Sequence, residues 1–197
     1  MRVAILLLGL FPTAPLFAGV EPPPAATQPA DPAMASREAR DQLVASARAR
    51  MRQDREKYSA EQLKDAEDLY QIANNDWRSD GARAALKAMI EKYPDINRTG
   101  CAVLYMGQMS RDAGEAEHRF RQAIDDYSDC WYLNGAQVGG LARLYLAGKY
   151  AREGRLDEAG KLLDEIEQDY PNAIDHRGRL LSSHVRALRE RMDQKKD

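Results

Sequence analysis

Cys101 and Cys130 offer the most specific chemistry in this sequence, because two cysteines can form a disulfide, exchange electrons or bind a soft metal ion. They do not form a Cys-x-x-Cys motif, and no histidine lies near either of them in the sequence, which disfavours a redox pair or a zinc site. Met106 and Met109 follow Cys101 at helical spacing, but methionines on such a face more often fill a core than bind a metal. We predict no metal site and keep a redox or metal accessory role for Cys101 and Cys130 as the alternative function.

The histidines and paired acids do not form a recognisable catalytic site. His118, His176 and His184 are far apart or separated by turns, and neither His-Glu-x-x-His nor Gly-x-Ser-x-Gly occurs. Neighbouring acids such as Asp125 and Asp126 diverge in direction on a helix, so they do not converge on one bond of a substrate. The glycine patterns of phosphate and dinucleotide sites are absent as well. The sequence therefore predicts a protein that is not an enzyme and that carries no cofactor.

The first residues are typical of a secretory signal peptide. Arg2 supplies a positive charge, an apolar run follows, and the small Ala18 ends a cleavage site, so we expect residues 1–18 to be removed. An uncleaved membrane anchor is the alternative, but two prolines interrupt the run, which is short for a membrane span. We expect a periplasmic or secreted protein that meets a membrane only through an uncleaved leader, if at all. In such a location Asn97-Arg98-Thr99 is a glycosylation sequon wherever the host glycosylates.

Residues 19–35, rich in proline and alanine, are expected to form an extended linker. Without Arg2, the 29 basic residues become 28 against 31 acidic ones, a net charge of −3. This balance gives no electrostatic reason to expect a nucleic-acid partner.

The period of the apolar residues is helical almost throughout the remaining chain. Ser36 can cap an N-terminal helix over residues 36–58, and Ser59 with Gln62 has the spacing of a capping box that opens a second helix. Runs of alternating β-branched residues and hairpin turns are absent, so we predict an all-α protein.

A similar phrase returns along this helical part. Tyr93 in "MIEKYPD" and Tyr127 in "AIDDYSD" are 34 residues apart, which is the period of a helix-turn-helix repeat, and Tyr170 in "EIEQDYPN" follows 43 residues later. The longer interval predicts an insertion between the second and third units, at "SDCWYLNGA".

On these residues the chain resembles the tetratricopeptide repeat family. The third unit resembles it most closely, with Leu146-Ala147-x2-Tyr150, Gly154 at the turn, Ala159-x3-Leu163 and Pro171. The second unit has Met106-Gly107-x2-Ser110 and Ala116-x3-Phe120, and the first has Ala82-x3-Leu86 and Pro94. The resemblance implies tandem antiparallel helix pairs over residues 59–176, closed by a capping helix over residues 177–197. An irregular helical bundle is the alternative.

Members of this family commonly bind a peptide or helix in the groove formed by the first helices, so the resemblance implies a scaffold for a protein or peptide partner. The corresponding positions of unit three are Leu141, Leu144, Gly148, Ala151 and Arg152, which are mostly apolar. Trp131 and Tyr132 of the insertion either join this binding surface or fill a gap between units. Self-association of the array is a third possibility.

The resemblance also bears on the cysteines. The first helices of successive units run side by side, so their beginnings are neighbours. Cys101 begins the first helix of unit two, and Cys130 precedes unit three. In an exported protein this placement favours a disulfide between them.

Overall fold

The computed structural model describes residues 31–194, and every regular element in this range is an α-helix, which confirms the predicted all-α class. The predicted signal peptide and most of the predicted linker lie outside the described residues. None of the described helices is long and apolar enough to cross a membrane. The helices are α1 (Arg37–Lys57), α2 (Ala60–Asn75), α3 (Asp80–Lys92), α4 (Asn97–Met109), α5 (Ala113–Tyr127), α6 (Val138–Glu153), α7 (Leu156–Asp169) and α8 (Leu181–Asp193).

Local sequence determines several helix ends. The Ser59 hydroxyl accepts a hydrogen bond from the Gln62 N–H, and the Gln62 side chain accepts one from the Ser59 N–H, so the predicted capping box is confirmed. Gly154 ends α6 with a φ of 80°, a left-handed conformation that glycine adopts without strain. The last helix begins at Leu181 rather than at the predicted residue 177, because residues 170–180 form a loop.

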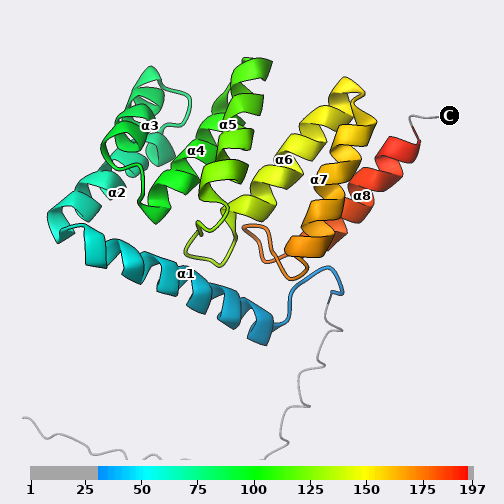
Figure 1. The fold of residues 1–197 in the computed structure, drawn as a ribbon, viewed down its shortest axis with the longest axis horizontal. Helices are drawn as coiled ribbons and strands as arrows, with labels where there is room; N and C mark the ends of the chain where they lie inside the picture. The colour runs from blue at the N-terminus through cyan, green and yellow to red at the C-terminus, as the bar shows by residue number, and fades with distance from the viewer. Residues whose placement is uncertain (1–30, 195–197) are drawn as a thin grey trace, which may run out of the picture. The chain divides into compact units, whose positions relative to one another are not determined.

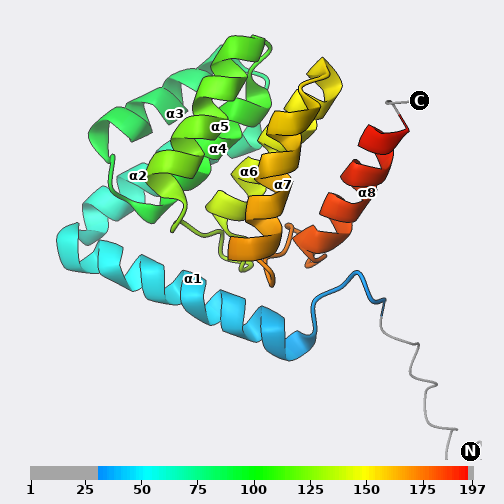
Figure 2. The same cartoon turned by 45° about the vertical axis from the view of Figure 1, so that its right-hand side comes forward.

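The helices from α2 onwards pack as successive pairs, α2 with α3, α4 with α5 and α6 with α7, and α8 follows (Figures 1 and 2). Each of α2, α4, α6 and α8 contacts the next member of this set, whereas α3, α5 and α7 do not contact one another. We call α2, α4, α6 and α8 the first-helix layer. Its members lie close enough together to form one continuous face.

Small residues permit the close packing within the pairs. A Cβ atom added to Gly107 of α4 would lie 2.6 Å from the Phe120 ring of α5. Ala147 of α6 and Ala159 of α7 are fully buried. Larger side chains at these positions would separate the helices.

Two loops at the junctions between pairs follow the same path. In residues 128–137 the Val138 N–H donates to the Cys130 carbonyl, and in residues 170–180 the Leu181 N–H donates to the Ala173 carbonyl. Gly135 and Gly178 occupy equivalent places with φ of 87° and 83°. The predicted insertion is therefore present at 128–137, and the sequence reading missed its counterpart after Tyr170, 43 residues further on.

Helix α1 lies across one end of the other helices and touches these junctions (Figure 1). Arg50 of α1 pairs with Asp129 at 3.1 Å, and its guanidinium also donates to the Asp95 carbonyl. The chain before α1 is held too, because the Ala35 N–H donates to the Gly178 carbonyl and Ala35 is buried. The end of the predicted linker, residues 31–35, is therefore not an extended tether.

Candidate functional site

Three of the predicted groove residues share one partly exposed stripe of α6. Leu144, Gly148 and Arg152 are spaced by four residues, so they lie above one another on the helix. They line two neighbouring cavities. The first, of about 440 Å³, lies between α6 and the α4–α5 pair, and the second, of about 300 Å³, lies between α6 and α8. We call the two together the α6 groove.

The two other α6 residues predicted for the groove, Ala151 and Leu141, lie in different environments. Ala151 lines the second cavity, whereas Leu141 is 0% exposed and belongs to the core, so its predicted role in the groove is wrong. The reason is that α6 contacts α4, α5, α7 and α8, which bury Leu141 but leave the stripe of Leu144 partly accessible.

The α6 groove combines an apolar floor with positive charge. Leu188 and Met192 of α8 line it beside Leu144. Arg152 and Arg191 also line it, and among the described residues neither pairs with a carboxylate. The arrangement can accommodate an apolar side chain next to a negatively charged one.

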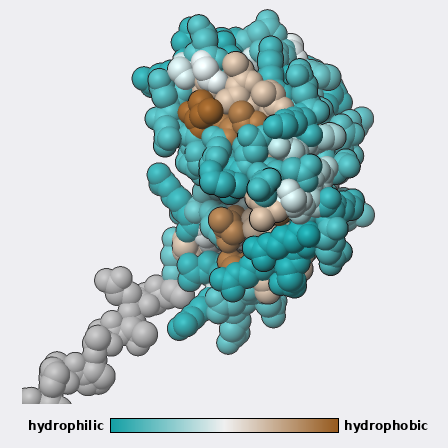
Figure 3. Space-filling view, turned by 90° about the vertical axis from the view of Figure 1, so that its left-hand side faces the viewer, coloured by the Kyte–Doolittle hydropathy of each residue, from teal (hydrophilic) through white to brown (hydrophobic). Residues whose placement is uncertain are grey.

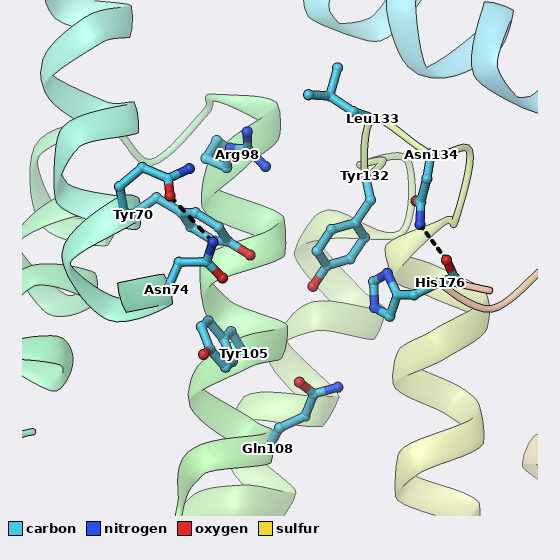
Figure 4. A pocket seen from close by; sticks show the side chains of 10 residues that line it. Tyr70, Asn74, Arg98, Tyr105, Gln108, Tyr132, Leu133, Asn134 and His176 are labelled. Atoms are coloured by element: carbon cyan, nitrogen blue, oxygen red, sulfur yellow. Dashed lines mark hydrogen bonds between the residues drawn. The ribbon is translucent and has the colours of Figure 1, made fainter. Parts of the chain in front are cut away.

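Trp131 and Tyr132 do not lie in the α6 groove. The backbone of Trp131 hydrogen-bonds to the Asn97 side chain, and Tyr132 lines another cavity of about 450 Å³, which shares Gln108 with the α6 groove (Figure 4). We call this cavity the tyrosine pocket. Its walls come from α2, α4 and the two junction loops, and its lining residues are Tyr70, Gln71, Asn74, Arg98, Tyr105, Gln108, Tyr132, Leu133, Asn134 and His176.

The tyrosine pocket has little free charge. Arg98 is its one Lys or Arg residue, and this side chain pairs with Glu67 at 2.7 Å and lies 4.6 Å from the centre of the Tyr70 ring. Desolvation lowers the pKa of the His176 imidazole, and desolvation raises the pKa of the buried Tyr132 hydroxyl well above its usual value. Apart from Arg98, which is paired with Glu67, the pocket is therefore lined by neutral groups near pH 7.

The sequence reading missed this pocket as a whole. Tyr70 with Asn74, and Tyr105 with Gln108, are each about one helical turn apart, so each pair shares a face of its helix. That spacing was the one sign in the sequence that these residues share a surface. The opposite wall depends on how the two junction loops fold.

Both cysteines are buried free thiols, and the predicted disulfide is not formed in the structure. Burial raises the pKa of Cys101 to about 12, which leaves little reactive thiolate at neutral pH. Among the described residues no group of three or more histidine, cysteine or acidic side chains can hold a metal ion. The sequon is inaccessible as well, because Asn97 is 1% exposed and its amide donates to the Trp131 carbonyl.

The remaining surface shows few apolar candidates. The face in Figure 3 is mainly hydrophilic, with small separate hydrophobic areas. Of the large hydrophobic residues in the described range, the exposed ones are Ile72, Trp77 and Leu133.

Comparison with family models, curated proteins and solved structures finds no significant match.

Proposed function

We propose that this chain is an exported, tetratricopeptide-like scaffold that binds a polypeptide through the α6 groove. The observation that carries the proposal is the stripe of Leu144, Gly148 and Arg152, which opens onto two adjoining cavities of the first-helix layer. Tandem helix pairs support the repeat architecture, and the apolar run after Arg2 supports export.

The groove favours a partner segment in which an aliphatic side chain stands next to an acidic one. The aliphatic group packs on Leu144, Leu188 and Met192. The acidic group pairs with Arg152 and Arg191, which have no carboxylate partner among the described residues. Burial of both thiols argues against the redox or metal alternative.

Selection from a random peptide library on the immobilised protein tests the proposal. We expect enrichment of peptides with adjacent acidic and aliphatic residues, and about tenfold weaker binding to Leu144→Glu and to Arg152→Glu. Lys87→Glu is the control, because Lys87 is exposed on α3 and lines neither cavity. Helical circular dichroism verifies that each variant is folded.

A photo-reactive residue at position 152, compared with one at position 87, extends the test to the native host. A partner captured from position 152 alone supports the proposal. Peptides that bind Leu144→Glu and the unchanged protein equally well would refute the α6 groove as the binding site. Sizing across a concentration series separates self-association, since a second copy of the chain would then be the bound molecule.

A further inference from the structure

The tyrosine pocket places aromatic rings on opposing walls. Figure 4 shows Tyr70 and Tyr105, from α2 and α4, on one side, and Tyr132 and His176, from the two junction loops, on the other. The centres of the Tyr70 and Tyr105 rings are 6.1 Å apart, and those of Tyr132 and His176 are 4.5 Å apart. A ligand in the pocket therefore meets aromatic rings on both walls.

The charges of the pocket select a neutral ligand. Asp and Glu are absent from its lining, and Arg98 is already paired with Glu67. The lowered pKa of His176 keeps that ring uncharged near neutral pH. Because 30% of the residues of the chain are charged, a cavity of this size without a free charge is an unusual part of its surface. A phosphate or an acidic peptide gains no counter-charge here.

The polar groups of the pocket both donate and accept hydrogen bonds. Four carboxamides line it, from Gln71, Asn74, Gln108 and Asn134. The Asn74 Oδ1 atom and the ring nitrogens of His176 have no hydrogen-bond partner within residues 31–194. These groups match a ligand whose hydroxyls donate and accept in turn.

The shape of the lining distinguishes a sugar from the other neutral ligands. Leu133, 58% exposed, is the one aliphatic residue of the pocket, so a peptide side chain finds no apolar socket. The rings meet at 45° and 90° within the two pairs, and the Arg98 guanidinium lies over Tyr70. Such rings do not form the parallel stack that holds a nucleobase, whereas a puckered sugar needs only one ring face.

We propose that the tyrosine pocket binds a sugar ring of an uncharged carbohydrate, at a site that shares only Gln108 with the α6 groove. The apolar face of the sugar stacks on Tyr105, and its hydroxyls hydrogen-bond with Asn74 and His176. The volume of about 450 Å³ lies within the range of small-ligand sites.

Calorimetry and ligand-observed NMR of the full chain with maltose, cellobiose, mannobiose and N,N′-diacetylchitobiose test the proposal. We expect saturable binding of at least one of these sugars, and about tenfold weaker binding to Asn74→Ala. Asn75→Ala is the matched control, since Asn75 is the neighbouring exposed amide and does not line the pocket. Tyr105→Phe keeps the stacking ring and most of the affinity, whereas Tyr105→Leu loses it.

The outcomes distinguish this proposal from the polypeptide groove. Leu144→Glu is expected to leave sugar binding unchanged, so the two proposals succeed or fail independently. Binding of none of the four sugars, or equal binding to Tyr105→Leu and the unchanged protein, overturns the proposal. Displacement of the sugar by a peptide selected on the α6 groove makes the pocket part of that groove and overturns it too. Tighter binding of adenosine than of any of the four sugars would also overturn the proposal.

Discussion

The side chain of Asn97 pairs with the backbone of Trp131 through both of its polar atoms. Its Oδ1 accepts from the Trp131 N–H at 2.7 Å, and its Nδ2 donates to the Trp131 carbonyl at 2.8 Å. The Asn97 N–H in turn donates to Asp54 of α1 at 3.0 Å. One buried amide at the start of α4 therefore connects α1 with the junction loop 128–137.

Replacing Asn97 by alanine is expected to lower the free energy of unfolding by about 1–3 kcal/mol, because the Trp131 N–H loses its acceptor and the Trp131 carbonyl keeps only a weak bond from the Cys101 thiol. Asn97→Asp should cost at least as much, since it loses the donor and places a charge beside Asp54. Denaturant titration measures both. Asn75→Ala, at an exposed amide, is expected to change stability little, and equal effects at positions 75 and 97 would contradict this reading.

Glu117 predicts a dependence of stability on pH. Hydrogen bonds from Arg155, Tyr150 and Arg121 lower the pKa of this carboxyl from 4.5 to about 2, although partial burial opposes the shift. A lowered folded-state pKa stabilises the protein fully above the unfolded value of 4.5, and this contribution is lost as the pH falls towards 2.

Glu117→Gln should therefore reduce the free energy of unfolding at pH 7 by about 1–2 kcal/mol and flatten its decline below pH 4.5. The loss of stability is modest because the Glu117 side chain is 22% exposed, so solvent screens its ion pairs. Thermal unfolding between pH 7 and pH 2.5 measures the difference. Glu91→Gln is the control, as Glu91 has no ion pair among the described residues. Parallel pH curves for Glu117→Gln and the unchanged protein would rule out the effect.

Two helical glycines should respond to alanine with opposite signs. At Gly107 the added Cβ lies 2.6 Å from the Phe120 ring, and the resulting strain of about 1–3 kcal/mol exceeds the gain in helix propensity. At Gly160 of α7 an added Cβ would meet nothing within 4 Å beyond the adjacent residues and the backbone of its own helix, so alanine should stabilise by about 0.5–1 kcal/mol. Denaturation midpoints of the two variants test this, and a stabilised Gly107→Ala would show that α4 and α5 are less closely packed than described.

The thiols of Cys101 and Cys130 should be unreactive towards thiol reagents in the folded protein. Both are buried, and the pKa of Cys101 is raised to about 12. We expect no rapid reaction with a chromogenic disulfide reagent in native buffer, and release of two thiols in denaturant without a reductant. Titration with and without reductant measures this. Thiols that appear only after reduction would reveal the disulfide that the structure lacks.

The features that the sequence predicts well are local ones. The Ser59 cap and the left-handed Gly154 depend on a few neighbouring residues, so their patterns identify them reliably. The all-α class follows from the period of the apolar residues for the same reason.

The features that it predicts poorly depend on distant contacts. Leu141 and Leu144 are both aliphatic residues of α6, and only the packing of four neighbouring helices decides which of them is exposed. The tyrosine pocket combines Tyr70 with His176, which are far apart in the chain, so helical spacing alone cannot bring them together. The cysteines show the same limit, because whether the two thiols meet depends on the packing of distant segments, and both are free and buried in the structure.

The matching junction loops have a consequence for the length of the molecule. Residues 128–170 begin just after one tyrosine and end on its counterpart, Tyr127 and Tyr170. A duplicate of this cassette inserted after Tyr170 would join Ser128 to a tyrosine, as in the present chain. The protein could thus be lengthened by one helix pair without designing a new connection. Helix α1 would keep its length, so it would no longer reach the last junction loop of the longer protein.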